Sequence, residues 1–329
     1  MKIRFGVIGT NWITDHFIEA AREHQDFVLK AVFSRTEESG TAFAKKHGIE
    51  HVYSDVEAMM QSGHIDAVYI ASPNSFHARY AIAAMQNGVH VLCEKPVASN
   101  KAELEQMIET AKQNKVLLME AMKSTLMPGF SAIAENIERI GTVRRYFASY
   151  CQYSSRYDAY KAGNIMNAFK PEFSNGALVD IGVYCIYPAV VLFGRPKSVK
   201  AVGYMLESGV DGEGSVLLEY ENMDAVIMFS KITNSQLPSE IQGEEGSIII
   251  ERMNEPVQIS LKLRSGLTED LTKPTVDRTM YYEAAEFIQL LQKGKLQSDI
   301  NTHEASLITM EIMDEARRQI GLRYAADDK

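Results

Sequence analysis

The sequence has 329 residues, of which 46% are hydrophobic and 23% charged, as in ordinary globular proteins, and its length favours two domains. The net charge of −9, from 34 basic and 43 acidic residues, argues against a nucleic acid as the main partner. We expect no membrane-spanning segment, because the apolar runs look shorter than roughly 18 residues, and no signal peptide, so a cytoplasmic protein is predicted.

The first 119 residues alternate between short apolar strands and helices. Strands are predicted at residues 3–8, 28–33, 52–53, 67–70, 89–93 and 116–119. Helices are predicted after residue 11 and at residues 36–47, 55–60, 77–86 and 100–114. This alternation is typical of a parallel, doubly wound sheet. We therefore expect an α/β domain over residues 1–122.

The turn after the first strand resembles a phosphate-binding turn. It keeps Gly9 after the strand, but the middle glycine of the G-x-G-x-x-G pattern is Asn11 and the last position is Thr14. Asparagine tolerates a left-handed backbone, so the turn stays feasible. The segment either lets the backbone approach a pyrophosphate or is merely a turn. The candidate cofactor contacts are Gly9, Thr10, Asn11, Trp12 and Ile13.

The end of the second strand bears on which cofactor would bind. The chain continues as Ser34-Arg35, with no acidic residue until Glu37. An acid at this place suits the ribose 2′-hydroxyl of NAD, whereas an arginine suits the 2′-phosphate of NADP. We expect Ser34 and Arg35 to hold that phosphate. The alternative is a surface arginine at the start of the next helix.

Two further strand ends carry polar side chains to the same edge of the sheet, where open α/β sheets bind ligands. After the fourth strand, Ser72, Pro73 and Asn74 form a turn and His77 begins a helix, either as a ligand contact or as a cap. After the fifth strand comes Glu94-Lys95-Pro96. Pro96 favours an extended Lys95, whose ammonium either polarises a carbonyl or lies in a solvated loop.

The second half predicts consecutive strands without helices between them, at residues 142–153, 198–205, 215–220, 225–229 and 246–250. Such strands imply an antiparallel sheet in an α+β domain, here over residues 123–329. Helices at residues 280–292 and 303–320 close the chain. One face of the sheet needs a cover, and the other could pair with a second copy.

Residues 175–188 have the apolar spacing of a buried helix entered through Gly176. Asp180 and Tyr184 are four residues apart, so they share one helical face and must point at something polar. A structural hydrogen bond between them is the alternative to a functional site. The three cysteines are far apart, so neither a disulfide framework nor a metal site is expected. Cys93 is either a reactive thiol or an apolar filler.

Together these segments resemble the glucose–fructose oxidoreductase / inositol dehydrogenase (Gfo/Idh/MocA) family of NAD(P)-dependent oxidoreductases. The resemblance rests on four stretches in this order, at residues 6–10, 73–77, 94–96 and 176–184. It implies a Rossmann domain followed by a domain with an open sheet that commonly mediates dimer or tetramer formation. Many members have histidine at the position of Tyr184. A tyrosine there resembles the trans-dihydrodiol dehydrogenase and glucose–fructose oxidoreductase branch.

The resemblance also implies a mechanism and partners. Hydride would pass between nicotinamide C4 and a carbon of a sugar, polyol or cyclic diol, with NADP as cofactor and NAD as the alternative. Tyr184 would act as acid–base, assisted by Lys95, and Asp180 would orient Lys95 or hydrogen-bond the substrate hydroxyl. Glu94 and His77 would line the nicotinamide side, and Pro96 would fix the turn. Lys123 and Arg156 are weaker candidates for substrate contact.

Two other functions remain open on the sequence. One is a silent dinucleotide-binding sensor, which the altered glycine turn favours slightly and the set Lys95, Asp180 and Tyr184 opposes. The other is an NAD(P)-linked epimerase or glycosidase on the same fold.

Overall fold

The computed structural model describes residues 1–328, which divide into two compact units. The first contains residues 1–121 and 276–303, and the second contains residues 122–275 and the chain from residue 304 onward. The sequence predicted a single change of domain after residue 122, whereas the chain returns to the first unit later. Phe287 in this returning segment packs on Phe5 with ring centroids 5.8 Å apart. The returning segment therefore completes the first core.

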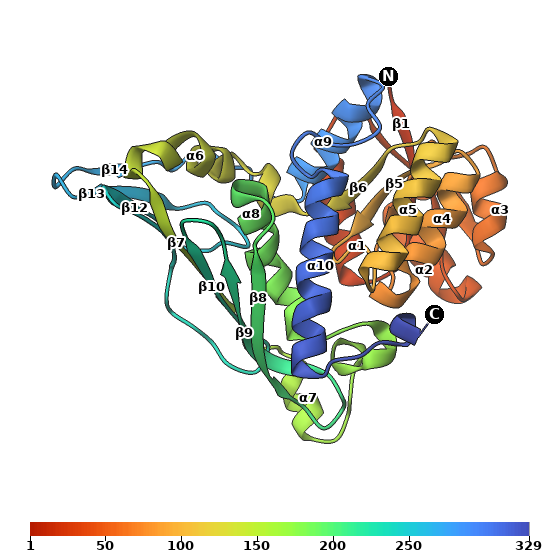
Figure 1. Ribbon diagram of the computed structural model, residues 1–329. Coiled ribbons are helices and arrows are strands. Elements are labelled where there is room, and N and C mark those ends of the chain that lie inside the picture. Colours follow the sequence, from red (N-terminus) through yellow and green to blue (C-terminus); the bar gives the residue numbers. More distant parts are fainter. Residues whose placement is uncertain (329) are drawn as a thin grey trace. The chain divides into compact units, whose positions relative to one another are not determined.

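The first unit is built on a six-stranded parallel sheet with strand order β3-β2-β1-β4-β5-β6 (Figure 1). Its strands are β1 (Ile3–Ile8), β2 (Phe27–Phe33), β3 (His51–Tyr53), β4 (Ala67–Ile70), β5 (His90–Glu94) and β6 (Leu118–Ala121). Its helices are α1 (Trp12–Ala21), α2 (Glu37–His47), α3 (Val56–Gln61), α4 (His77–Gln86), α5 (Lys101–Asn114) and α9 (Tyr281–Gln292). The predicted doubly wound parallel sheet is confirmed.

Local sequence explains these boundaries. The central strands are covered on both faces, and Val7, Val68 and Leu92 are fully buried, which is why the strands are unbroken apolar runs. Helix α2 begins where the Thr36 side chain accepts a hydrogen bond from the backbone of Ser39. The last strand begins two residues later than predicted, because the N–H of Val116 still closes the end of α5.

The second unit is built on an eight-stranded sheet with strand order β14-β13-β12-β11-β7-β10-β9-β8. Its strands are β7 (Val143–Cys151), β8 (Ser198–Met205), β9 (Asp211–Glu219), β10 (Asp224–Ser230), β11 (Ser239–Gly243), β12 (Gly246–Ile250), β13 (Ile259–Leu263) and β14 (Thr268–Asp270). The mostly antiparallel sheet is confirmed, but β7 and β10 are parallel. Strands β11, β13 and β14 were not predicted.

Helix α8 (Val183–Phe193) covers one face of this sheet. The other helices of this unit are α6 (Pro128–Asn136), α7 (Tyr157–Lys161) and α10 (His303–Ile320). The phenol of Tyr146 on β7 donates to the carbonyl of Cys185 on α8, 2.9 Å away. The hydroxyls of Tyr187 on α8 and Ser306 on α10 are 3.1 Å apart. The predicted buried helix is confirmed, and it begins with a π-helical turn, Leu178–Gly182.

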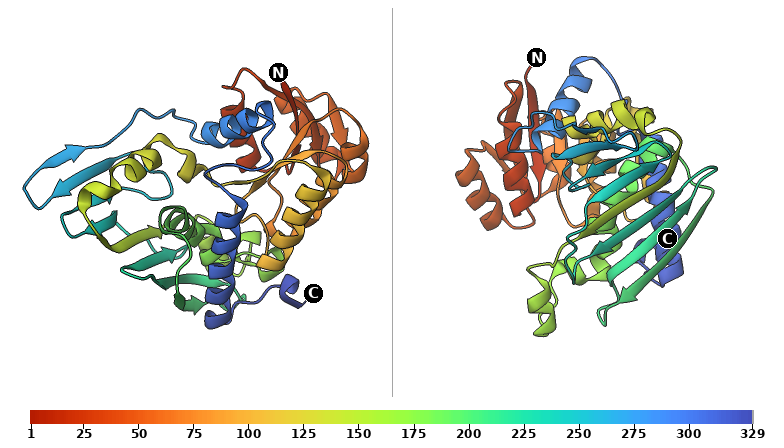
Figure 2. Two further views of the ribbon diagram at one scale, coloured as in Figure 1. Left: turned by 45° about the horizontal axis from the view of Figure 1, so that its top comes forward. Right: turned by 90° about the vertical axis from the view of Figure 1, so that its left-hand side faces the viewer.

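The other face of the sheet is open, and the right-hand view of Figure 2 shows its strands in front of the helices of the same unit. Leu217, Val226 and Phe147 are paired neighbours across three strands on this face. Leu217 is 49% exposed, and Val202 on the outermost strand is 70% exposed. An apolar row therefore crosses three strands, β9, β10 and β7, of an uncovered sheet face.

One apolar segment is longer than the sequence analysis allowed. Pro171–Phe193 is long and apolar enough by composition to cross a membrane, so the expectation that no such run exists is wrong. However, 72% of its apolar window is buried within the structure. Leu178 and Ile186 are fully buried. This helix is thus part of the core, as in many soluble proteins.

Candidate functional site

The turn after β1 is held tightly against the end of β4. Gly9 has a φ of 109°, and a Cβ at this position would lie 2.6 Å from the carbonyl oxygen of Ala71. The N–H of Gly9 donates to the carbonyl of Phe33 at the end of β2. Only glycine fits this turn, because other residues would meet both a strained φ and the backbone of the neighbouring strand.

Asn11 does not use the left-handed backbone that the sequence analysis invoked, since its φ is −98°. Instead, it caps helix α1. Its Oδ1 accepts hydrogen bonds from the N–H groups of Ile13 and Thr14, and its Nδ2 donates to the carbonyl of Ala71, 2.7 Å away. The asparagine therefore replaces the second glycine of the usual pattern with a side-chain cap.

The end of β2 presents a cation. Ser34 is buried, and its N–H donates to the carbonyl of Tyr53 on β3. Arg35 is exposed and has neither a hydrogen bond nor an ion pair to residues 1–328. The hydroxyl of Thr10 in the glycine turn lies 3.1 Å from that of Ser39 on α2. Strand β2 thus ends with a guanidinium and without a carboxylate, which suits a phosphate.

The turn that carries Lys95 is fixed by buried polar groups from two neighbouring strands. The phenol of Tyr69 on β4 donates to the carboxylate of Glu94 at 2.5 Å, and the same carboxylate accepts from the backbone N–H of Lys95. Glu120 on β6 accepts from the N–H of Val97 at 3.1 Å. The Lys95–Pro96 peptide bond is cis. Glu94 is 8% exposed, so its carboxylate mainly supports the turn.

His77 ties this turn to the end of β4. Its ring is fully buried, with Nδ1 2.9 Å from the carbonyl oxygen of Pro96 and Nε2 2.9 Å from that of Ser72. Burial lowers the pKa of His77 and the charge of Lys95 lowers it further, whereas the two carbonyls oppose the shift. A neutral ring has one N–H, so it donates to one of the two carbonyls.

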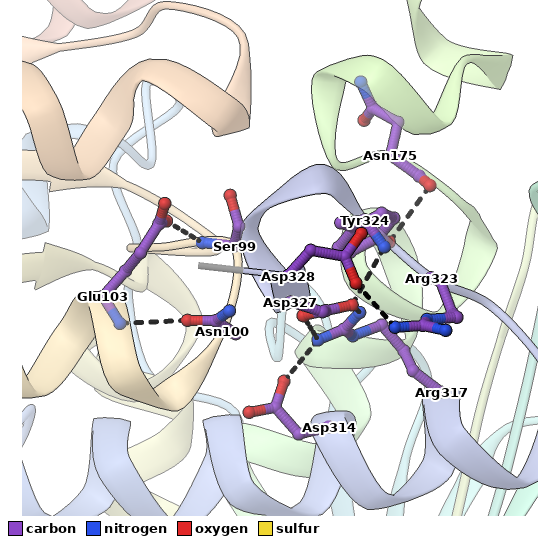
Figure 3. Close-up of polar contacts among 10 residues, drawn as sticks. All are labelled: Ser99, Asn100, Glu103, Asn175, Asp314, Arg317, Arg323, Tyr324, Asp327 and Asp328. Carbon is purple, nitrogen blue, oxygen red and sulfur yellow. Dashed lines mark hydrogen bonds and ion pairs between the residues drawn. The ribbon is translucent and has the colours of Figure 1, made fainter.

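The segment after Lys95 ends in a capping box, which Figure 3 shows. The side chain of Asn100 accepts from the N–H of Glu103 at 2.9 Å, and the carboxylate of Glu103 accepts from the N–H of Ser99 at 3.0 Å. The other predicted turn, after β4, contains a short 3₁₀ turn, Asn74–Phe76, that leads directly into α4. Pro73 and Asn74 are half-buried there.

In the second unit, Asp180 and Tyr184 stand out from their helix. Every other residue between positions 176 and 190 is buried, whereas these two are half-exposed. Oδ2 of Asp180 lies 2.8 Å from Nζ of Lys231, at the end of β10. The ring of Tyr184 lies edge-on to that of Tyr150 on β7, with centroids 5.8 Å apart. The helix therefore presents one carboxylate and one phenol from an apolar segment.

The start of this helix depends on Asp211 at the beginning of β9. Its Oδ2 accepts from the N–H of Leu178 at 2.7 Å. Burial raises the pKa of Asp211 to about 6, against the opposing effects of this hydrogen bond and of the charge of Lys231. A Cβ at Gly176 would lie 2.0 Å from Oδ1 of the same carboxylate.

Sequence reasoning missed Lys231 and Asp211. Lys231 follows the apolar run of β10, and Asp211 begins β9 after a glycine turn; neither belongs to a motif. The weaker candidates lie elsewhere in the same unit. Lys123 pairs with Glu255 at 2.8 Å, and Arg156 is half-buried next to α7.

The cysteines are free thiols. Cys93 is fully buried, and burial raises its pKa well above the ordinary value, so the apolar-filler interpretation is supported over a reactive thiol. Among residues 1–328, no group of three or more His, Cys, Asp or Glu side chains is arranged to hold a metal ion.

Comparison with known families and proteins agrees with this architecture. Residues 3–122 match the model of an oxidoreductase family with an NAD-binding Rossmann fold, and residues 132–249 match the GFO/IDH/MocA C-terminal domain. The chain is 55% identical over 325 residues to scyllo-inositol 2-dehydrogenase (NADP(+)) IolU of Bacillus subtilis (strain 168), covering 99% of both chains. It is 32% identical over 341 residues to trans-1,2-dihydrobenzene-1,2-diol dehydrogenase of Xenopus tropicalis, covering 98% of this chain and 100% of the relative.

Solved structures show the same fold. KijD10, a 3-ketoreductase from Actinomadura kijaniata solved with NADP and TDP-benzene, has a TM-score of 0.85 and 24% identity, covering 97% of this chain and 98% of that one. Levoglucosan dehydrogenase in complex with NADH has a TM-score of 0.85 and 20% identity, covering 97% of this chain and 98% of that one. The chain therefore belongs to the Gfo/Idh/MocA family of NAD(P)-dependent oxidoreductases.

Proposed function

We propose that this protein is an NADP-dependent dehydrogenase that oxidises a secondary hydroxyl of a ring polyol or cyclic diol, or reduces the matching ketone. The observation that carries the proposal is the 55% identity, over 99% of the chain, to an enzyme named for scyllo-inositol and NADP(+). The relatives named for trans-1,2-dihydrobenzene-1,2-diol are more distant, but their substrate is also a ring with neighbouring hydroxyls.

The residues at the carboxyl ends of the first sheet suit NADP. The turn from Gly9 to Ile13 would hold the diphosphate, and Ser34 with the exposed Arg35 would hold the 2′-phosphate. Ser72, Pro73 and Asn74 would flank the same edge. When bound, the nicotinamide supplies hydride transfer at C4. His77, Glu94 and Pro96 would act by fixing the turn of Lys95, because all three are buried.

Three side chains would handle the proton and the charge. The phenolate of Tyr184 would take the proton from the reacting hydroxyl during oxidation, and the phenol would return it to the ketone during reduction. Lys95 would supply positive charge where an alkoxide develops and would stabilise the phenolate. Asp180 would accept a hydrogen bond from a substrate hydroxyl, because an ionised carboxylate only accepts. We propose that Lys95 and Tyr184 serve the same reaction.

The test is a panel of ring polyols and diols with NADP⁺ and NAD⁺, followed by the absorbance of the reduced nicotinamide. Scyllo-inositol, myo-inositol, trans-1,2-cyclohexanediol and glucose would cover the class. We expect NADPH to accumulate with at least one ring polyol and more slowly with NAD⁺. Cofactor binding without turnover of any alcohol or ketone would indicate a sensor. Epimerised product without net NADPH would indicate an enzyme that returns the hydride to its substrate.

We further propose a cytoplasmic homodimer or homotetramer joined through the open sheet face. The apolar row around Leu217 supports this, because exposed apolar patches mark association surfaces. Light scattering after gel filtration tests it: Leu217→Glu should lower the mass towards the monomer. Leu267→Glu is the matched control, since Leu267 is 48% exposed and lies at the turn between β13 and β14. An unchanged mass for both variants would rule out this interface.

A further inference from the structure

Lys231 is a buried cation with three partners in the second unit. The residue is 3% exposed. Its Nζ lies 2.8 Å from Oδ2 of Asp180, donates to the carbonyl of Ala168 at 2.9 Å, and lies 4.9 Å from the ring centroid of Phe169. Lysine is almost never fully buried unless it is paired. The carboxylate of Asp180 is its ionic partner.

The two members of this pair differ in exposure. The side chain of Asp180 is 36% exposed, whereas that of Lys231 is 4% exposed. The ammonium therefore lies beneath a carboxylate that reaches the surface of its unit. Burying a cation is costly, and buried pairs can often be replaced by apolar residues without loss of stability. Stability alone does not explain a lysine at this position.

The strand pairing explains how Lys231 reaches this position. Strands β7 and β10 are parallel, with Tyr150 opposite Phe229 and Cys151 opposite Ser230. Because parallel strands end at the same edge, the ends of both lie next to the helix of Asp180 and Tyr184. Tyr150 packs against the Tyr184 ring from one strand, and Lys231 binds Asp180 from the other.

We propose that Lys231 is a positioning residue for the dehydrogenase reaction, which acts through Asp180. Its ammonium, 2.8 Å from Oδ2 of Asp180, fixes the plane of the carboxylate, so that Asp180 can accept a hydrogen bond from a substrate hydroxyl. This inference rests on the proposed function, in which Asp180 contacts the substrate. Lys231 itself contacts neither the substrate nor the cofactor.

A double-mutant cycle tests the inference. Lys231→Met should lower kcat/KM for the polyol at least tenfold, with the Kd for NADPH within twofold of the parent. In an Asp180→Asn background the same change should cost less than threefold, because the carboxylate that Lys231 positions is gone. Equal losses in both backgrounds, or an unchanged kcat/KM for Lys231→Met, would overturn the proposal. If Lys231→Met does not fold, Lys231→Gln keeps a donor for Ala168 and removes the charge.

Arg317→Met is the matched control for the loss of a buried cation. The side chain of Arg317 on α10 is also 4% exposed and pairs with Asp314 and Asp327, as Figure 3 shows. This variant should lower the melting temperature while kcat/KM stays within twofold. A fall in kcat/KM for the control equal to that of Lys231→Met would assign both losses to stability and overturn the positioning role.

A crystal structure of the Lys231→Met variant separates this inference from the proposed function. We expect the Asp180 carboxylate to leave its present orientation. If Asp180 stays in place, Lys231 does not position it, whatever the activity. If wild-type protein turns over no polyol, the proposed function fails while the crystal structure still decides the role of Lys231 in holding Asp180.

Discussion

Gly176 leaves the space that the buried carboxylate of Asp211 occupies. A Cβ at position 176 would lie 2.0 Å from Oδ1 of Asp211, and the φ of Gly176 is 156°. Oδ2 of the same carboxylate accepts from the N–H of Leu178, at the first turn of the helix that carries Asp180 and Tyr184. A side chain at position 176 would therefore disturb the start of the helix that carries Asp180 and Tyr184.

Gly176→Ala should destabilise the protein by about 1–3 kcal/mol, because it overpacks a buried site at a strained φ. Chemical denaturation measures the free energy of unfolding. The control is Gly163→Ala, whose φ is 84° but whose Cβ would have no atom within 4 Å. It reports the cost of the backbone conformation alone. An equal cost for both variants would mean that the contact with Asp211 is not the cause.

Asp211 should make stability fall as the pH rises. Its folded pKa of about 6 lies above the usual aspartate value, so its contribution is present below about pH 4 and is lost as the pH rises through 6. One pKa unit corresponds to about 1.4 kcal/mol, so the loss is on the order of 3 kcal/mol. Asp211→Asn keeps the acceptor for Leu178 but does not titrate. The unfolding free energy of wild type relative to this variant should decline between pH 4 and 7, and a flat difference would contradict the shift.

Tyr184→Phe and Lys95→Met should each lower kcat by roughly 10² or more, the usual scale for a lost acid–base group. NADPH binding should be largely kept, which the fluorescence of Trp12, the single tryptophan, can report. Tyr220→Phe is the control, because its hydroxyl donates to the carbonyl of Gly194 in the second unit. Activity within a few-fold of the parent in both test variants would reject the roles of Tyr184 and Lys95.

Arg35→Ala should weaken NADPH binding about 10- to 100-fold, the scale of a lost charge-assisted hydrogen bond, and leave NADH binding unchanged. Isothermal titration with each cofactor measures both constants. Lys45→Ala removes another exposed cation, from the last turn of α2, and should affect neither. If the binding of NADPH and the binding of NADH weaken equally, Arg35 does not bind the 2′-phosphate.

The sequence determined the first sheet and its ligand edge. Unbroken apolar strands alternating with capped helices are local signals, and the carboxyl ends of parallel strands fall at one edge. Gly9, Arg35, His77 and Lys95 could therefore be assigned to that edge before any coordinates. The spacing of Asp180 and Tyr184 on an apolar helix was equally local.

Only the tertiary structure decided what supports those residues. Lys231 and Asp211 reach the helix of Asp180 and Tyr184 through the pairing of β7, β9 and β10. No local sequence pattern predicts which strands become neighbours. The helix α9 joined the first core for the same reason, because its apolar face does not specify which core it will cover. Hydrophobic periodicity is a local property of the sequence, whereas the pairing of distant strands and helices depends on how they pack in the folded protein.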